Sequence, residues 1–383
     1  MSKKIAVLTG SRAEYGILKP LLNQLLERKD FELVLLVTGL HLLKEYGHTI
    51  ANIKKDKFKI DSIVEMYDEK ETDVYYGAAL ARGIKNLSLE LSKINPDLLI
   101  VLGDRLEPLA ATLAAATLNI PIAHIHGGDK TDSGLIDESI RHSITRFAHI
   151  HFPATEDHKR RLIRMGEEPW RIFKVGSMGI DTIIQRKKIP RKELSKKLHF
   201  EINDKTFILI FHPVHLEEDL GDQMREILEA LKELELKTII LYPNNDPGNE
   251  KIITEIEKVR RLDNFRIFKN IEHDEYIDLL KHVAVIIGNS SSGIIEAPTL
   301  KIPVINIGSR NRNRGRTENI IYVDPKKDQI IEAINKALYD KDFRKKIKKI
   351  ENPFGDGKTA ERISQIIKEV RFDAKLMIKK ITY

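Results

Sequence analysis

The stretch IAVLTGSRAEYGILKPLLNQLLERKDFELVLLVT, residues 5–38, decides the fold class of this chain. Residues 5–8 and 33–38 are short aliphatic runs of the kind found in buried strands. Between them, residues 18–28 place leucines at the spacing of an amphipathic helix. A strand, a helix and a second strand in this order predict a parallel β-α-β unit with helices on both faces of its sheet.

The same alternation continues along the chain and pauses once, after residues 173–176. We therefore expect an α/β protein with two doubly wound parallel-sheet domains, residues 1–180 and residues 181–358. Residues 359–383 form a separate terminal segment, in which residues 359–381 have the pattern of one long amphipathic helix. The other expected strands are residues 60–65, 98–102, 122–125, 150–152, 207–211, 238–242, 265–268, 283–287 and 304–307.

The composition excludes several classes of protein. The 383 residues include 64 Lys and Arg, 57 Asp and Glu and no Cys, which gives a net charge of +7. Without Cys there are no disulfides, iron–sulfur clusters, thiolate zinc sites or thiol nucleophiles. Because Lys and Glu are interleaved, the charge is typical of a solvated surface, and we expect no nucleic acid partner. Asn119 and Pro121 interrupt the longest apolar stretch, residues 109–125, so we expect no membrane partner. The N-terminus has no signal-peptide pattern, so we expect a cytoplasmic protein.

Ligands of parallel sheets bind beyond the carboxyl ends of the strands, so the residues after each strand are the first candidates for a site. Gly10 and Arg12 follow the first strand, where a tight turn, free backbone N–H groups and a cation would suit an anion. The glycine spacing differs from that of dinucleotide-binding loops. Asp104 and Arg105 follow the fourth strand, and Asp104 is either a helix cap or a catalytic acid.

Acidic residues are concentrated after the fifth strand. The two glycines before Asp129 would let a substrate approach the backbone closely. Asp129, Asp137 and Glu138 would bring like charges to one place, which raises the pKa of at least one of them and suits acid/base catalysis. His124 and His126 would share one face of a strand, but no third firm ligand has a suitable spacing, so we expect no metal.

Polar residues follow the strands of the second half as well. Ser290, Ser291 and Ser292 stand between two glycines, and hydroxyls with exposed N–H groups at a helix start would hold a diphosphate. Glu296, about one turn further along the same helix, would accept from both ribose hydroxyls. Arg310 would add a cation over the same phosphates. The remaining polar residues that end strands here are His212 and Asn244.

The segment NPFGDGKT, residues 352–359, ends like a phosphate-binding loop for ATP. However, Asn352 occupies the position of the first required glycine, and no strand precedes the segment. We expect a turn before the last helix and no ATP site.

Together these motifs resemble those of the hydrolysing UDP-N-acetylglucosamine 2-epimerases. The resemblance implies a GT-B fold, in which two Rossmann-like domains bind a nucleotide sugar in an interdomain cleft and the last helix crosses back to the N-terminal domain. It also implies conversion of UDP-GlcNAc and water to ManNAc and UDP for sialic acid synthesis, without a cofactor, by a homodimer. The segments that carry it are GSRAEYG at 10–16, GDR at 103–105, HIHGGD at 124–129, DESIRH at 137–142, FHP at 211–213, GNSSSG at 288–293 and NPFGDG at 352–357.

The resemblance assigns acid/base catalysis to Asp104, Asp129 and Asp137, with Glu138 adjacent. In the relatives, the residue after the double glycine is Glu, and Asp129 is shorter by one methylene. The following loop varies in length, so Asp137 and Glu138 are both candidates for one role. Uridine and diphosphate binding falls on Arg12, His212, Asn244, Ser290, Ser291, Glu296 and Arg310. His212 is also a catalytic candidate, and Gly10, Arg105, His126 and Ser292 complete the expected substrate contacts.

Several alternatives stay open at the level of sequence. A non-hydrolysing epimerase would return UDP to the glycal intermediate and release UDP-ManNAc. A GDP-linked or diacetamido sugar could replace UDP-GlcNAc, because contacts to ribose and phosphate do not read the base. A GT-B glycosyltransferase would need an acceptor groove and no base at C2, and a non-catalytic nucleotide-sugar sensor would need no acidic cluster.

Overall fold

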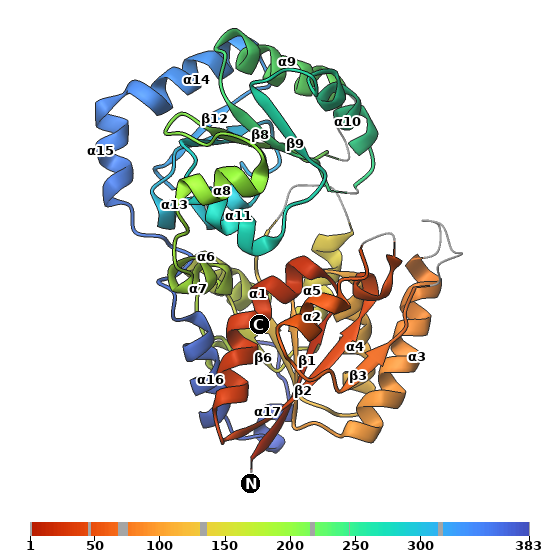
Figure 1. The fold of residues 1–383 in the computed structure, drawn as a ribbon. Coiled ribbons are helices and arrows are strands. Elements are labelled where there is room, and N and C mark those ends of the chain that lie inside the picture. The colour runs from red at the N-terminus through yellow and green to blue at the C-terminus, as the bar shows by residue number, and fades with distance from the viewer. Residues whose placement is uncertain are drawn as a thin grey trace. The chain divides into compact units, whose positions relative to one another are not determined.

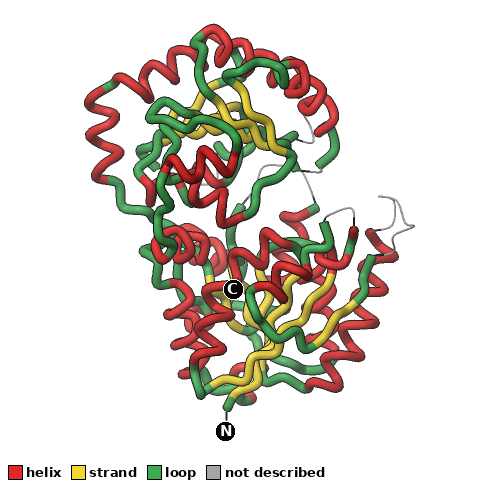
Figure 2. Tube along the Cα trace, in the orientation of Figure 1, coloured by secondary structure: helices red, strands yellow, loops and turns green. Residues whose placement is uncertain are grey.

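The chain folds into two compact units, each a six-stranded parallel sheet with helices on both faces (Figures 1 and 2). The first unit comprises Met1–Asp129, Ile136–Thr182 and Pro353–Tyr383, and the second contains Ile183–Asn352. The predicted α/β class with two doubly wound sheets is confirmed. This computed structural model describes residues 2–44, 47–67, 76–130, 136–214, 219–244, 246–312 and 317–382.

The first sheet has the strand order β3-β2-β1-β4-β5-β6. The direction of winding reverses between β1 and β4, the point beyond which such sheets bind ligands. Its strands are β1 (Lys3–Thr9), β2 (Phe31–Thr38), β3 (Ser62–Val64), β4 (Leu98–Leu102), β5 (Ile122–Ile125) and β6 (Ile150–Phe152). Its helices are α1 (Arg12–Glu27), α2 (Ile50–Lys55), α3 (Tyr76–Ile94), α4 (Leu106–Thr117), α5 (Asp137–Phe147) and α6 (Glu156–Arg164), with α7 (Met178–Gln185) at its end.

Both faces of the first sheet are buried, which explains why its strands are continuously apolar. Ile5 and Val7 of β1 point into a core that they share with α1. Ala6 and Leu8 point to the opposite face and pack with α3 and α4. Successive side chains of a strand alternate between the faces, so a strand covered on both sides needs apolar residues at every position.

The second sheet repeats the pattern with the order β12-β11-β10-β7-β8-β9. Its half-buried edge strand β12 (Ile320–Val323) was not among the expected strands. The other strands are β7 (Phe207–Ile210), β8 (Thr238–Leu241), β9 (Phe265–Phe268), β10 (Val285–Gly288) and β11 (Val304–Ile307). The helices are α8 (Arg191–Leu198), α9 (Leu220–Glu233), α10 (Asn249–Lys258), α11 (His273–Leu280), α12 (Ser292–Ile295), α13 (Ala297–Leu300), α14 (Lys327–Tyr339) and α15 (Lys341–Lys349).

The terminal segment is not one long helix, and that prediction is wrong. Helix α16 (Thr359–Glu369) ends, and α17 (Ala374–Met377) begins after a break. The ammonium group of Lys3 donates to the last carbonyls of α16, at 2.8 Å from Ile367 and 2.7 Å from Val370, and so caps the helix end. Asp373 then caps α17 by accepting from the backbone N–H of Leu376 at 3.1 Å.

The turn expected before the last helix is present. Gly355 and Gly357 both have positive φ, at 133° and 86°. The carbonyl of Phe354 accepts from the backbone N–H of Ser177 at 2.6 Å, so this loop packs within the first unit. The side chain of Asp181 on α7 caps α16 by accepting from the N–H groups of its first two residues.

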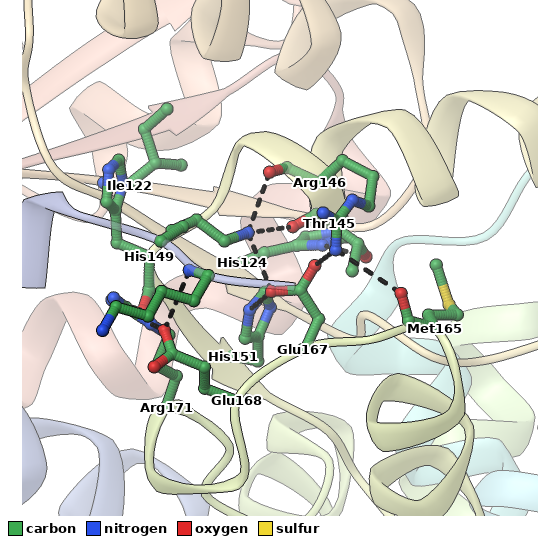
Figure 3. A network of polar contacts seen from close by, with 12 residues as sticks. Ile122, His124, Thr145, Arg146, His149, His151, Met165, Glu167, Glu168 and Arg171 are labelled. Atoms are coloured by element: carbon green, nitrogen blue, oxygen red, sulfur yellow. Dashed lines mark hydrogen bonds and ion pairs between the residues drawn. The ribbon is translucent and has the colours of Figure 1, made fainter. Parts of the chain in front are cut away.

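A buried ion network also holds the end of the chain on the first unit (Figure 3). The carboxylate of Glu167 lies 3.0 Å from His151 Nε2 and 2.8 Å from Lys379 Nζ, and it pairs with Arg146 as well. Burial alone would raise the pKa of Glu167, but the hydrogen bonds from His151 and Lys379 lower it to about 2. Among the described residues, no helix combines the length and apolar character that a bilayer span requires.

Candidate active site

Two carboxylates and a backbone carbonyl surround the guanidinium of Arg141, of whose side chain only 2% is exposed. Asp104, in the turn after β4, accepts a hydrogen bond from Arg141, and Glu138, one turn earlier on α5, accepts another. The carbonyl of Asp129 lies 3.2 Å from Arg141 Nη1. Three sequence segments named as candidates therefore meet at one buried cation.

The positive charge of Arg141 changes the picture given by the sequence, which suggested only repulsion among neighbouring acids. Burial disfavours the charge on Arg141, but Asp104, Asp129 and Glu138 outweigh it and raise the pKa of Arg141 above its ordinary value. Arg141 is therefore permanently charged, and it offsets the like-charge repulsion expected among the acids. The planar guanidinium also fixes the orientation of the carboxylates that accept from it.

Asp129 is held from a second side by α6. Its Oδ1 lies 3.4 Å from Nε2 of His158, and 10% of the Asp129 side chain is exposed. Gly128 has φ of 77°, and a Cβ there would lie 2.5 Å from the His158 carbonyl oxygen. Gly128 is thus required because the loop packs closely against α6. Asp137 is the first residue of α5 and is half-buried.

The turn that carries Asp104 is fixed through His124, which is buried on β5 (Figure 3). His124 Nε2 lies 2.8 Å from the carbonyl oxygen of Gly103, and Nδ1 lies 3.1 Å from the Thr145 hydroxyl on α5. Burial lowers the pKa of His124 to about 3, so the ring is neutral. Because a carbonyl only accepts, Nε2 carries the proton and Thr145 donates to Nδ1.

The shared strand face predicted for His124 and His126 is wrong. Strand β5 ends at Ile125, and His126 adopts φ of 67°, so the alternation stops before it. His126 is half-buried in the loop after β5. No group of three possible metal-ligating side chains occurs in the part of the chain that the structure describes.

The turn after β1 differs from the expected anion-binding loop. The backbone N–H of Gly10 donates to Glu14 Oε2 at 2.6 Å, so it is engaged within the chain. A Cβ on Gly10 would lie 2.7 Å from Cγ of Glu107, whose carboxylate also binds Arg105 at 3.3 Å. Burial, with Glu107 nearby, raises the pKa of Glu14 to about 8. Arg12 is half-buried in the first turn of α1.

In the second unit, His212 follows β7 and is a neutral hydrogen-bond donor. Its Nδ1 accepts from the backbone N–H of Asn244 at 3.1 Å, which leaves the ring proton on Nε2. Burial and the charge of Arg310 lower the pKa of His212 to about 3. A neutral ring with one N–H suits a phosphate contact better than the acid/base role for which His212 was also considered.

The serine-rich loop after β10 has a different local structure from the one expected. The helix that follows it, α12, has four residues, and Glu296 lies at the junction of α12 and α13 and not inside one helix. The hydroxyl of Ser292 is buried and accepts from Tyr276. Ser290 and Ser291 are half-buried at the turn. These two serines are therefore the hydroxyls best placed for a ligand.

Arg310 follows β11 and belongs to a polar group at the ends of β8 and β11. Its Nη2 lies 3.8 Å from Asp246 Oδ2, which also accepts from Asn244 Nδ2 at 2.6 Å. The same arginine lowers the pKa of His212. The structure therefore gathers His212, Asn244 and Arg310 within the second unit, as the sequence suggested.

Comparison with known proteins decides the family. A family described as UDP-N-acetylglucosamine 2-epimerase matches residues 23–368. The chain belongs to this family. The match covers parts of both units and includes Asp104, Arg141 and His212.

Similar curated proteins of this family cover the chain over most of its length. A Legionella pneumophila protein named UDP-N,N'-diacetylbacillosamine 2-epimerase (hydrolyzing) is 38% identical over all of both chains. An Escherichia coli protein named polysialic acid biosynthesis protein P7 is 34% identical over 96% of this chain and 94% of that protein. A Neisseria meningitidis UDP-N-acetylglucosamine 2-epimerase is 36% identical over 88% of this chain and 87% of its own.

Solved structures confirm the GT-B-like fold of two Rossmann-like domains. The UDP-GlcNAc 2-epimerase of Neisseria meningitidis, bound to UDP-GlcNAc, has a TM-score of 0.83 at 22% identity and covers 95% of this chain and 99% of its own. The enzyme of Methanocaldococcus jannaschii, in complex with UDP-GlcNAc and UDP, has a TM-score of 0.79 at 23% identity with the same coverage.

The sequence analysis did not single out several residues that organise the site. Arg141 stands three residues after Glu138, and this helical spacing was the available signal for an ion pair on one face of α5. His158 and Glu107 had no comparable signal, because their contacts to Asp129 and to the Gly10 turn depend on how the helices pack. Glu14 stands three residues after Ser11, the helix cap of α1, and this capping-box spacing was a signal that the analysis did not use. Asn289 belongs to the segment GNSSSG at 288–293, in which the sequence analysis considered only the serines and glycines.

Proposed function

We propose that this chain is a hydrolysing UDP-N-acetylglucosamine 2-epimerase, which converts UDP-GlcNAc and water to ManNAc and UDP. The observation that carries the proposal is the meeting of Asp104, Glu138 and the Asp129 loop at Arg141. A glycosyltransferase would need no base at the carbon next to the anomeric centre, and a nucleotide-sugar sensor would need no acid cluster. Membership of the family supports the same conclusion.

The reaction requires positioned acids and bases because the C2 hydrogen of the sugar is not adjacent to a carbonyl group. Departure of UDP gives C1 the character of an oxocarbenium ion, which acidifies the hydrogen on C2. A carboxylate takes this proton while the electrons of the C1–O bond leave with the diphosphate, and 2-acetamidoglucal forms. Water then adds across the double bond, with its oxygen on C1 and a proton on C2, to give the inverted centre.

We assign one proton transfer at C2 to Asp104 and the other to an acid of the Asp129 loop or of the start of α5. Asp104 is 31% exposed although Arg141, which binds it, is buried. A substrate can therefore reach the carboxylate while the guanidinium fixes its orientation. Each well-placed acid or base contributes roughly 10²–10⁴ in rate. Asp129, Asp137 and Glu138 are the candidates for the second proton transfer.

We assign UDP to the second unit. The Nε2–H group of His212 and the hydroxyls of Ser290 and Ser291 donate to the diphosphate, and Arg310 supplies positive charge. These groups act where negative charge develops as the C1–O bond breaks. The nucleoside contacts fall to Asn244 and Glu296.

A UDP-linked diacetamido sugar is the second candidate substrate. The full-length relative from Legionella pneumophila, at 38% identity, carries the name of an enzyme for such a sugar. A Campylobacter jejuni relative named GDP/UDP-N,N'-diacetylbacillosamine 2-epimerase (hydrolyzing) is 33% identical over 90% of both chains. Both sugars have an N-acetyl group at C2, so the same acids would serve either substrate.

We further propose that the product enters the synthesis of sialic-acid-type sugars in the cytoplasm and that the enzyme is a homodimer. The Escherichia coli relative named for polysialic acid biosynthesis supports the metabolic role. The homodimer rests on the family resemblance, and the cytoplasmic location is the expectation made from the sequence. Light scattering of the purified protein measures the mass of the assembly and tests the dimer.

Incubation of the purified protein with UDP-GlcNAc, GDP-GlcNAc and UDP-N,N'-diacetylbacillosamine in separate reactions tests the assignment. We expect ³¹P NMR to show UDP release from UDP-GlcNAc and ¹H NMR to show free ManNAc. Formation of UDP-ManNAc without UDP release would identify the non-hydrolysing reaction. Turnover of the diacetamido substrate alone would favour the second candidate, and no turnover of any of them would reject the proposal.

A further inference from the structure

Asn289, the first residue after β10, contacts the backbone of His212 and has no part in the proposed chemical steps. Only 1% of the residue is exposed. The backbone N–H of His212 donates to Asn289 Oδ1 at 2.7 Å, and Asn289 Nδ2 donates to the His212 carbonyl at 2.8 Å. One side chain therefore satisfies both backbone polar groups of His212, as a neighbouring strand would.

The close pairing of β7 and β10 makes this contact possible. Gly288 has φ of 125°, and a Cβ there would lie 2.0 Å from the carbonyl oxygen of Ile210. The backbone N–H of Asn289 donates to this same carbonyl at 3.1 Å. The Asn289 amide thus continues the ladder between the two strands beyond their last paired residues.

Two other buried asparagines hold Asn289 in place. The Nδ2 group of Asn311 donates to the Asn289 carbonyl at 2.7 Å and to Asn306 Oδ1 at 3.2 Å. Both residues are 1% exposed. Hydrogen bonds among buried amides are directional and costly to break, so this group fixes the ends of β10 and β11 relative to each other.

The imidazole of His212 is held from the opposite side. Its Nδ1 accepts from the backbone N–H of Asn244, so the ring presents Nε2–H. Burial and Arg310 keep this ring neutral, with a pKa of about 3. The backbone contact to Asn289 and the ring contact to Asn244 together fix both the orientation and the tautomer of His212.

We propose that Asn289 is a positioning residue for nucleotide binding, which holds the His212 backbone so that the imidazole Nε2–H donates to a bound diphosphate. The inference rests on the proposed function for the identity of the ligand. Replacing the amide by a carboxylate of the same shape removes the donor to the His212 carbonyl and places two acceptors against each other. Asn289→Asp should therefore disturb His212 with little change in volume.

A double-mutant cycle on UDP binding, measured by calorimetry, tests this proposal. We expect Asn289→Asp and His212→Ala each to weaken UDP binding roughly tenfold, and the double variant to be no weaker than His212→Ala alone. Asn319→Asp is the matched control, because Asn319 is also buried in the second unit and donates to a backbone carbonyl, that of Ile302, at 2.9 Å. This control should lose stability and keep its UDP affinity. Additive losses from Asn289→Asp and His212→Ala would overturn the proposal.

A second measurement is independent of ligand and activity. In wild-type protein labelled with ¹⁵N-histidine, the His212 signals should be those of a neutral ring protonated at Nε2 from pH 5.5 to 8. Folded Asn289→Asp or Asn289→Ser variants should show a shifted or averaged pattern. A wild-type ring that titrates in this range, or carries its proton on Nδ1, would overturn the inference even if neither variant folds. Absence of UDP binding by wild type, with the expected ring signals, would instead contradict the proposed function.

Discussion

The two sheets share one strand order, but the residues beyond their carboxyl ends differ in chemistry. In the first unit, acids meet at the buried cation of Arg141. In the second, the central contact is made by neutral groups, the Asn289 amide and the backbone of His212. The difference shows that one fold supplies two kinds of local chemistry, and under the proposed function the first transfers protons and the second offers N–H donors to an anion.

The two sites also hold their central residues by different means. Arg141 keeps its charge because three acidic residues raise its pKa against the effect of burial. His212 loses the ability to become charged at neutral pH because burial and Arg310 lower its pKa. Substitutions in the first site should therefore change the chemical step, and substitutions in the second should change the affinity for the nucleotide.

Asp104→Asn should give the largest effect. Removing the ionised oxygen that takes a proton should reduce kcat by roughly 10²–10⁴, because general base catalysis contributes about that much. The affinity for UDP, measured by calorimetry, should stay within twofold of wild type. A collapse of UDP affinity would make Asp104 a binding residue and would remove the contrast between the two sites.

Arg141→Lys should lower kcat roughly 100-fold, because a single ammonium cannot hold Asp104 and Glu138 in the geometry of the guanidinium fork. Steady-state kinetics with saturating nucleotide sugar measures the effect. The control is Arg160→Lys, since Arg160 is an exposed residue of α6 that pairs with Asp157. Equal activities of the two variants would show that Arg141 serves only stability.

Arg310→Ala should weaken UDP binding roughly tenfold, because a charge-assisted contact to the diphosphate is lost. Arg312→Ala is the matched control, since Arg312 is two residues away, is half-exposed and pairs with Asp324. Calorimetric titration with UDP compares the two. The same dissociation constant in both variants would exclude Arg310 from the site.

Glu14→Gln should have the smallest effect on turnover, because it changes the stability of the first unit and not the chemical step. The folded-state pKa of Glu14 is raised to about 8 from 4.5, so the folded state binds more protons between these values and wild type loses stability as pH rises. The variant lacks this loss, which amounts to at most about 1.4 kcal/mol per pH unit. Its stability relative to wild type should grow from pH 5 to pH 8 in urea unfolding.

Glu27→Gln is the control for that experiment, because Glu27 ends the same helix and is exposed. Its stability relative to wild type should stay constant with pH. Parallel pH dependences of wild type and Glu14→Gln would show that Glu14 is ionised in the folded protein.

The fold was largely predictable because it depends on local patterns. Strands buried on both faces are continuous apolar runs, so β1 and β5 were readable from the sequence. The half-buried edge strand β12 (Ile320–Val323) is also an apolar run, and the prediction missed it although its sequence carried this signal. The break after α16 was missed although Asp373, which caps α17, was a local signal for it. The contact from Lys3 to the end of α16 joins residues more than 360 positions apart, so no local pattern could reveal that contact.

The site was predictable where a residue directly follows a strand. Asp104 and His212 were found in this way, since topology brings the strand ends of each sheet to one edge. Contacts that depend on helix packing were not found: Glu107 reaches the Gly10 turn from the start of α4, and His158 reaches Asp129 from α6. His126 was misjudged because its left-handed backbone ends the strand alternation.

The central claim is that carboxylates of the first unit move the proton at C2 while UDP departs. Its most direct test is the NMR and mass analysis of sugar released from UDP-GlcNAc in D₂O. The account predicts free ManNAc with one deuterium at C2, and no labelled sugar from Asp104→Asn. ManNAc released without deuterium at C2 would contradict it.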